Sequence, residues 1–219
     1  VDYKIDVTID MFAELAPISN IQAIKESTRD VTNVTRLRNA FGDRFSILCG
    51  VDTLALEELV LGADGWVAGL VCAFPAETVT VFKLVKAGRI EEAINIYRWF
   101  MPLLELDIHP KLVQYIKLAE SKTGLGSEFV RRPRLVLEGA ERQKIEMAKH
   151  TEKGYFMIIK NYYLLSEIRK SNQKEATLNQ SIKSYYNFVD LFPNSKYMKE
   201  AEKLFKNSTE QLKKLKGNG

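Results

Sequence analysis

Lys25 is the residue in this sequence that could act most directly as a nucleophile. It ends the apolar run at residues 21–24 and stands directly before a polar turn at residues 27–30. Only a neutral amine attacks a carbonyl, and an exposed lysine has a pKa near ~10.4, so this role requires burial that lowers the pKa by roughly 3 to 5 units. We therefore predict that Lys25 lies at the rim of a buried sheet. An ordinary surface lysine at a strand end is the alternative.

Acidic residues and histidines could also do chemistry, but their spacing favours structural roles. Glu57-Glu58 and Glu91-Glu92 are pairs of sequence neighbours, so the members of each pair do not share one face of a helix. His109 precedes Pro110, and His150 lies near a change in composition, and neither has a serine, cysteine or aspartate partner at a recognisable spacing. We predict solvated carboxylates and structural histidines.

Short apolar runs that alternate with helical patterns are the elements that must position Lys25. They cover residues 21–25, 45–49 and 66–70, at intervals of about 20 to 25 residues. Such runs predict parallel strands that are buried on both faces, with helices between them. Helical periodicity predicts helices over residues 9–16, 31–41, 54–61, 76–87, 90–104, 110–121 and 139–149.

Several motifs resemble, in order, the second half of the dihydrodipicolinate synthase and N-acetylneuraminate lyase family. They are Ile24-Lys25-Glu26-Ser27-Thr28, Gly50-Val51-Asp52, Leu61-Gly62-Ala63-Asp64-Gly65-Trp66-Val67, Gly88-Arg89-Ile90-Glu91-Glu92-Ala93 and Arg131-Arg132-Pro133-Arg134-Leu135. The resemblance covers residues 1–146. It implies an α/β fold, namely the last three or four βα units of a partial (β/α)8 TIM barrel, followed by a helical C-terminal subdomain.

The same resemblance implies the chemistry of a class I, Schiff-base-forming aldolase. In the family, the lysine that matches Lys25 forms an imine with pyruvate or another 2-oxo acid. The turn at Gly50 and the backbone at Val67 would line the pocket beside that imine and hold the substrate. No cofactor and no metal is implied. The resulting prediction is a lyase, aldolase or dehydratase that acts on 2-oxo acids.

Two family motifs that take part in this chemistry are not found in the sequence. One is a Tyr-Asn-x-Pro motif, whose tyrosine shuttles a proton, and the other is a Gly-Thr-Thr/Ser-Gly-Glu segment that binds the pyruvate carboxylate. A whole barrel takes roughly 250 residues, whereas this chain has 219. We therefore expect an incomplete, weakly active or inactive barrel that self-associates as a homo-oligomer through its open edge.

The tail of the chain differs from the rest in charge and pattern. Residues 1–146 carry 18 Lys and Arg against 21 Asp and Glu, whereas residues 147–219 carry 14 against 7. Three helices are predicted over residues 154–165, 176–192 and 195–216, with a polar loop at residues 171–175. The tail resembles a tetratricopeptide repeat (TPR) segment of the outer-membrane assembly lipoprotein BamD, on the motifs Ser184-Tyr185-Tyr186, Phe192-Pro193-Asn194-Ser195 and Tyr197-Met198-Lys199-Glu200-Ala201. Generic packing of helical hairpins is the alternative.

These patterns predict three regions and leave two classes of function open. Residues 1–87 form the partial barrel, residues 88–149 the helical subdomain, and residues 150–219 a TPR-like helical module. The first function is the lyase above. The second is a non-catalytic helical module that binds a protein partner, with the chain as a chimera of two fragments. We expect a cytoplasmic location for the first part and a periplasmic or outer-membrane-associated one for the second.

Composition argues against several other classes. No apolar run approaches the ~18 residues of a membrane span, and the chain opens with Val1-Asp2-Tyr3-Lys4, which is not a signal peptide. The positive charges of the tail are interspersed with acids and tyrosines, so solvated helix faces are a better interpretation than a nucleic-acid or lipid surface. Cys49 and Cys72 are predicted to be small core residues rather than a disulfide or a metal pair.

Overall fold

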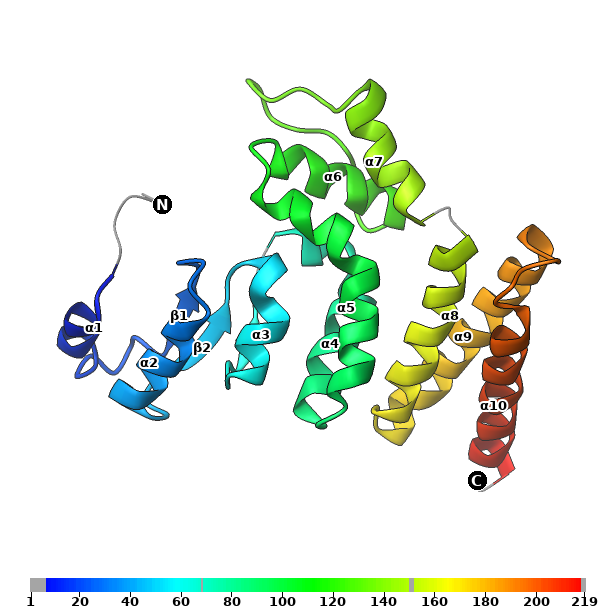
Figure 1. Cartoon of the computed structure of the whole chain (residues 1–219), viewed down its shortest axis with the longest axis horizontal. Helices are drawn as coiled ribbons and strands as arrows, with labels where there is room; N and C mark the ends of the chain where they lie inside the picture. Colours follow the sequence, from blue (N-terminus) through cyan, green and yellow to red (C-terminus); the bar gives the residue numbers. More distant parts are fainter. Residues whose placement is uncertain (1–6, 68, 150–151, 218–219) are drawn as a thin grey trace.

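The fold is an elongated row of elements that starts with a small α/β unit and continues as packed helices (Figure 1). The computed structural model describes residues 7–67, 69–149 and 152–217. Within them, the helices of residues 75–86, 90–104, 152–167, 171–191 and 198–217 stand side by side after the sheet. His150 and the predicted boundary between residues 149 and 150 lie at or outside the limits of the described residues.

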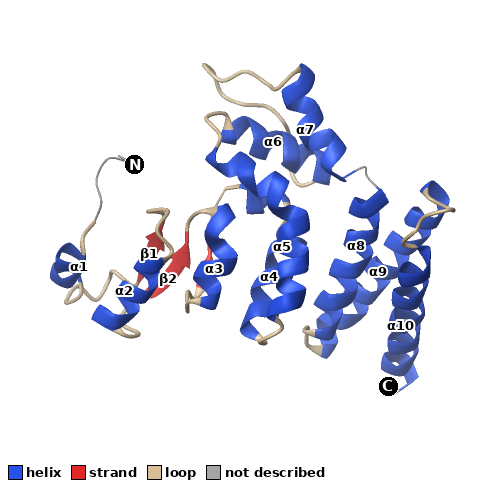
Figure 2. Ribbon diagram, in the orientation of Figure 1, coloured by secondary structure: helices blue, strands red, loops and turns tan. Residues whose placement is uncertain are grey.

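A parallel sheet of three strands forms the α/β unit (Figure 2). Its strand order is β1-β2-β3, with Ala23 opposite Ser46 and Leu48 opposite Gly65. The elements of this unit are α1 (Ile9–Leu15), β1 (Ala23–Glu26), α2 (Thr32–Phe41), β2 (Ser46–Cys49), the 3-10 turn η1 (Asp52–Leu54), α3 (Ala55–Val60) and β3 (Gly65–Trp66). The predicted parallel βα order is confirmed.

Burial of the strands alternates, so the prediction that both faces are buried is wrong. Ile24 and Ile47 are buried in one core cluster with Val34 and Leu37 of α2. The neighbouring residues in each strand, Lys25 among them, face the other way and are exposed or half-buried. In the described part of the chain the sheet has three strands and does not close on itself, so this second face is left largely uncovered.

The third strand is shorter than the sequence indicates. The apolar run at residues 66–70 predicts a strand, but β3 ends at Trp66 and Leu70 begins the 3-10 turn η2 (Leu70–Ala73). The physical reason is the Asp52 carboxylate, which accepts the backbone N–H of Leu70 at 2.8 Å and so holds the chain in a turn instead of a ladder. Leu70 is still fully buried, which explains its apolar character.

Helices after β3 agree with the predicted periodicity to within two residues at each end. They are α4 (Pro75–Lys86), α5 (Ile90–Leu104), the 3-10 turn η3 (Glu105–Ile108), α6 (Leu112–Thr123) and α7 (Gly139–Lys149). Within α5, a buried stripe at Ala93, Ile96, Tyr97 and Phe100 has the spacing of one helix face, which is the signal that located the helix in the sequence.

The tail consists of α8 (Glu152–Glu167), α9 (Ser171–Leu191) and α10 (Met198–Gly217). Three predicted helices are thus present, but the predicted polar loop at residues 171–175 is wrong. Backbone N–H groups of Gln173 and Lys174 bond to the carbonyl of Lys170, so the helix already begins at Ser171 despite its polar first turn. Within the described residues, no helix is both long and apolar enough to cross a bilayer.

Helix α8 fastens the tail to α4 and α5. Arg89, in the turn between α4 and α5, binds Glu92 at 2.6 Å and reaches Glu167 of α8 at 2.8 Å. Asn161 of α8 is buried, and neither polar atom of its side chain has a hydrogen-bond partner among the described residues. The attachment therefore combines an ion-pair network with an unsatisfied polar group, which is costly.

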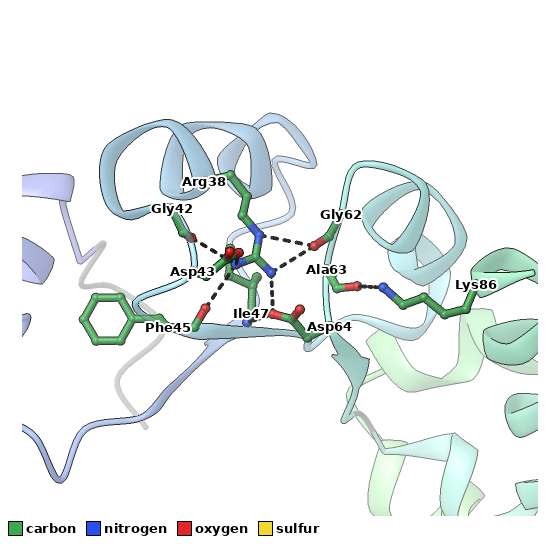
Figure 3. A network of polar contacts seen from close by, with 9 residues as sticks. All are labelled: Arg38, Gly42, Asp43, Phe45, Ile47, Gly62, Ala63, Asp64 and Lys86. Carbon is green, nitrogen blue, oxygen red and sulfur yellow. Dashed lines mark hydrogen bonds and ion pairs between the residues drawn. The ribbon is translucent and has the colours of Figure 1, made fainter. Parts of the chain in front are cut away.

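An arginine clamp fixes the amino-terminal end of the sheet (Figure 3). Arg38 of α2 donates to the carbonyls of Gly42, Phe45 and Gly62, at 3.1, 3.2 and 3.0 Å, and it also binds Asp64. The same Asp64 oxygen accepts the backbone N–H of Ile47 at 2.7 Å. One side chain thus joins the loops that lead into β2 and β3.

Candidate active site

A cavity of about 390 Å³ opens at the carboxyl ends of the three strands. It is formed by the turn after β1, the turn after β2, the residue before η2, the end of η3 and the loop that leads into α6. Its walls are Lys25, Ser27, Arg29, Gly50, Val51, Gly69, Asp107, Ile108, His109, Pro110 and Leu112. Carboxyl ends of parallel strands are where α/β proteins bind their ligands.

Lys25 lies on the cavity wall but is not buried. It is exposed because it points from β1 to the uncovered face of the sheet. Burial of its amine, which we predicted from sequence, is therefore not found in this chain. Among the described residues, no side chain or carbonyl forms a hydrogen bond or ion pair with its Nζ atom, so the amine is open to a ligand in the cavity.

Gly50 lies directly against the turn that carries Lys25. A Cβ atom at Gly50 would meet Ser27 Oγ at 2.0 Å, the carbonyl oxygen of Glu26 at 2.4 Å and Lys25 Cε at 3.0 Å. Only glycine fits there, because the backbone of Glu26 cannot move away without distorting β1. The structure thus brings the two predicted site residues Lys25 and Gly50 into contact, and the assigned roles of both stay predictions.

Val67 lies beside the cavity, not in its wall. Its N–H donates to the carbonyl of Cys49 at 2.8 Å, which extends the β2–β3 ladder by one bond, and 49% of the residue is exposed. Gly69, two residues farther along the chain, does line the cavity. The substrate-binding role of the Val67 backbone stays a prediction.

Buried Glu26 organises the turn between β1 and α2. Its carboxylate accepts the backbone N–H of Thr28 at 2.6 Å, the hydroxyl of Thr28 and the side-chain amide of Asn33. Asp30 then accepts the backbone N–H of Thr32 at 3.0 Å and so caps the start of α2. The predicted capping role of residues 27–30 is thus carried by Asp30.

Asp52 is a fully buried acid behind the cavity. It accepts Trp66 Nε1 at 2.9 Å and the N–H of Leu70 at 2.8 Å, and its carbonyl accepts the Tyr97 hydroxyl at 2.7 Å. Burial, followed by repulsion from Asp107, raises the pKa of Asp52 to about 7, against the effect of these donors. This residue joins the turn after β2 to β3, η2 and α5.

Asp107 and His109 are cavity residues that the sequence did not reveal. Asp107 lies in η3, and His109 follows directly after it in the loop that leads to α6. His109 Nδ1 accepts the N–H of Lys111 at 3.0 Å, and its ring packs edge-on against Tyr115, so the neutral ring carries its proton on Nε2. The sequence indicated a structural histidine. The one signal for a polar site that the sequence offered was Asp107, which stands two residues before His109.

Glu58 and Cys49 form a buried polar pair behind β2. Glu57 is exposed as predicted, but Glu58 is only 1% exposed, so the interpretation of the pair as solvated is wrong for Glu58. Burial raises the pKa of Glu58 to about 7 and that of the Cys49 thiol well above its usual value. Cys49 is a core residue as predicted, whereas Cys72 is exposed because it falls in η2 and not at a strand end.

The fold and the cavity together define a class of protein: part of a parallel βα barrel with a lysine at the carboxyl end of a strand. Comparison with known proteins agrees with this class. Residues 3–151 match the model of the Dihydrodipicolinate synthetase family, and the chain belongs to this family. The family resemblance predicted from sequence is confirmed for this part. The match does not extend over the tail, and the resemblance of the tail to a TPR segment stays a prediction.

Curated relatives include two kinds of enzyme. An N-acetylneuraminate lyase of Clostridium perfringens is 29% identical over 152 residues, which are 69% of this chain and 51% of the relative. A 4-hydroxy-tetrahydrodipicolinate synthase of Pelodictyon phaeoclathratiforme is 29% identical over 127 residues, which are 58% of this chain and 43% of the relative. The chain thus spans about half the length of the curated relatives it matches.

Solved structures agree on the fold. Dihydrodipicolinate synthase from Acinetobacter baumannii, in a complex with pyruvate, superposes with a TM-score of 0.61 at 25% identity, over 67% of this chain and 50% of that one. The enzyme from Agrobacterium tumefaciens gives a TM-score of 0.59 at 28% identity, over 66% and 50%. The expected partial barrel is thus confirmed as three parallel strands with helices, followed by a helical region.

Proposed function

We propose that Lys25 forms an imine with pyruvate or another 2-oxo acid, in a lyase, aldolase or dehydratase of which this chain supplies about half the barrel. The observation that carries the proposal is the unpaired Lys25 amine on the wall of the cavity, in contact with Gly50. Support also comes from the family match and from the relative that was solved with pyruvate.

The chemistry follows from an amine and a ketone. The Nζ lone pair of Lys25 bonds to C2 of the acid, the ketone oxygen leaves as water, and a protonated imine remains. That cation withdraws electrons from the bonds next to C2, so a carbon–carbon bond there can break or form, or water can be lost. Asp107 and His109 line the same cavity and can exchange a proton with the departing oxygen through intervening water.

The backbone at Gly50 and Val67 is proposed to hold the substrate beside the imine. Gly50 supports this role by letting the turn after β2 pack directly against Lys25 and Ser27, where any side chain would collide with them. Because Lys25 is exposed here, we expect slow turnover by this chain alone.

The uncovered face of the sheet supports the proposed self-association, which sedimentation at several concentrations would measure.

Trapping with pyruvate and sodium borohydride tests the proposal. Reduction converts the imine to a stable amine, and peptide mapping by mass spectrometry locates it. We expect the adduct on Lys25 of the wild type and none on the K25R variant, while K183R, a change to an exposed lysine on α9, keeps it. Labelling spread over many lysines, or equal labelling of K25R, would refute the assignment.

We infer a second role, protein binding, for α8, α9 and α10. Support comes from an aromatic core of their own, in which Tyr185 stacks on Phe205 at 4.4 Å, and from Tyr186 and Leu191 of α9, each 55% exposed. The resemblance of these helices to a tetratricopeptide repeat likewise remains a proposal. Capture of a partner by the full chain, and its loss in a Y186S/L191S variant that still folds, would test this role.

A further inference from the structure

Arg29 is a strained and unpaired cation on the wall of the Lys25 cavity. Its φ is 66°, and it is the one non-glycine residue in the described part of the chain with a positive φ. Side chains with a Cβ rarely adopt this left-handed region. No described residue forms a hydrogen bond or ion pair with its guanidinium, whereas Arg36 and Arg44 nearby are both engaged, with Asp30 and with backbone carbonyls.

The residues on both sides of Arg29 keep it in this conformation. Thr28 is bound through its backbone N–H and its hydroxyl to buried Glu26, and the Thr28 hydroxyl in turn accepts the N–H of Asp30 at 3.3 Å. Asp30 is itself bound to Thr32 and Arg36. Because both neighbours are fixed, the turn imposes the positive φ on Arg29. Backbone strain that the surroundings enforce in this way is concentrated at functional sites.

Charges in the cavity are distributed unequally across the sheet. Lys25 and Arg29 belong to the strand end and the turn of β1, whereas Asp107 lies against Gly69, after β3, and against the backbone of Asp52. With β2 between them, β1 and β3 are separated by roughly 10 Å, two strand spacings. The β1 side of the cavity is therefore the cationic side, and an anion bound there is distant from Asp107.

Arg29 also stands farther out than Lys25. Lys25 lies within β1, while Arg29 follows in the exposed turn four residues later. The carboxylate on C1 of a 2-oxo acid is next to the carbon that reacts with the amine, so it stays close to Lys25. A group that reaches Arg29 must come from the other end of the substrate. A guanidinium is suited to this contact because it binds a carboxylate through two parallel hydrogen bonds.

We propose that Arg29 binds the distal carboxylate of a 2-oxo dicarboxylic acid whose ketone condenses with Lys25. This inference rests on the proposed function for the imine and adds to it the substrate class. Arg29 is thus a specificity-determining residue that contacts substrate without taking part in bond changes.

Two acids of similar length test this assignment by borohydride trapping at Lys25. They are 2-oxoglutarate, with a distal carboxylate, and 2-oxohexanoate, without one. We expect the wild type to reach half-maximal trapping at a concentration about tenfold lower for 2-oxoglutarate, as one charge-assisted pair allows. R29Q should lose this preference, and R29G should do the same while it relieves the strained φ. R98Q, a matched loss of charge at an exposed residue of α5, should keep it.

Direct binding separates this inference from the imine. Glutarate and valerate have no ketone, so calorimetric titration measures the carboxylate site without reaction at Lys25. If trapping fails with both 2-oxo acids, the proposed function fails, whereas binding of glutarate that R29Q abolishes would still support the role of Arg29. An R29Q variant that keeps the preference for 2-oxoglutarate, or a wild type that binds glutarate no better than valerate, would overturn it.

Discussion

Replacement of Glu58 by glutamine is expected to stabilise this protein at neutral and alkaline pH. The residue is 1% exposed, and its Oε2 atom has no hydrogen-bond partner among the described residues. Burial, chiefly, raises its pKa from 4.5 to about 7. Glutamine has nearly the same shape and no charge, so E58Q removes the cost of ionising a buried acid and leaves the packing of α3 on β2 intact.

The magnitude follows from the pKa. One pKa unit corresponds to about 1.4 kcal/mol, so ionised Glu58 lowers the free energy of unfolding by up to about 3 kcal/mol. The folded state holds the Glu58 proton more tightly than the unfolded state, so this stability is complete below pH 4.5 and is lost as the pH rises to about 7. E58Q should therefore resemble the wild type at pH 4.5 and exceed it at pH 8.

Urea unfolding at pH 4.5, 6 and 8 measures this difference. The pKa of Asp52 is also raised to about 7, so ionisation of Asp52 lowers the free energy of unfolding of wild type and variant alike as the pH rises. The difference between the two proteins therefore reports on Glu58. The control is E57Q, which removes a charge from the exposed neighbour in α3 and should change little. A gap between E58Q and wild type that does not widen with pH would refute the reasoning.

Three further substitutions test contacts that hold the fold together. G50A should lower the free energy of unfolding by about 1–3 kcal/mol, because its Cβ would meet Ser27 and Glu26, and should reduce trapping at Lys25; unchanged urea unfolding would contradict the close approach. R38M should cost about 2–3 kcal/mol through the lost carbonyl contacts, and an unchanged midpoint would contradict the clamp. N161L should raise the free energy of unfolding by about 1–2 kcal/mol, since the buried amide is unsatisfied, and a lower melting temperature would show that the amide has a partner.

Local signals in the sequence predicted much of the frame. Helix α5 was located at residues 90–104 because its apolar residues recur on one face, and the family resemblance placed Gly50 beside Lys25. Burial of both sheet faces was wrong, since an apolar run does not reveal whether a second layer covers it. Only the structure answers that question, because it shows that exposed and buried residues alternate along β1.

Long-range contacts account for what the sequence did not reveal in the site. Asp107 and His109 lie about 80 residues after Lys25 in the chain, and only the fold brings them to the same cavity. The positive φ of Arg29 depends on bonds between its neighbours and buried Glu26. Glu58 resembles Glu57 in sequence, and only the orientation of α3 separates a solvated acid from a buried one.

The arginine clamp has a consequence for how such a protein can diverge. Arg38 ties the loops at the amino-terminal end of the sheet, whereas Lys25, Arg29 and Asp107 lie at the opposite end. Substitutions at the exposed positions of the turns around the cavity, such as Ser27 and Arg29, therefore leave the clamp untouched, so new substrate preferences can accumulate there with little loss of thermal tolerance. Mutational libraries confined to those exposed positions should yield mostly folded variants, and libraries around Arg38 few.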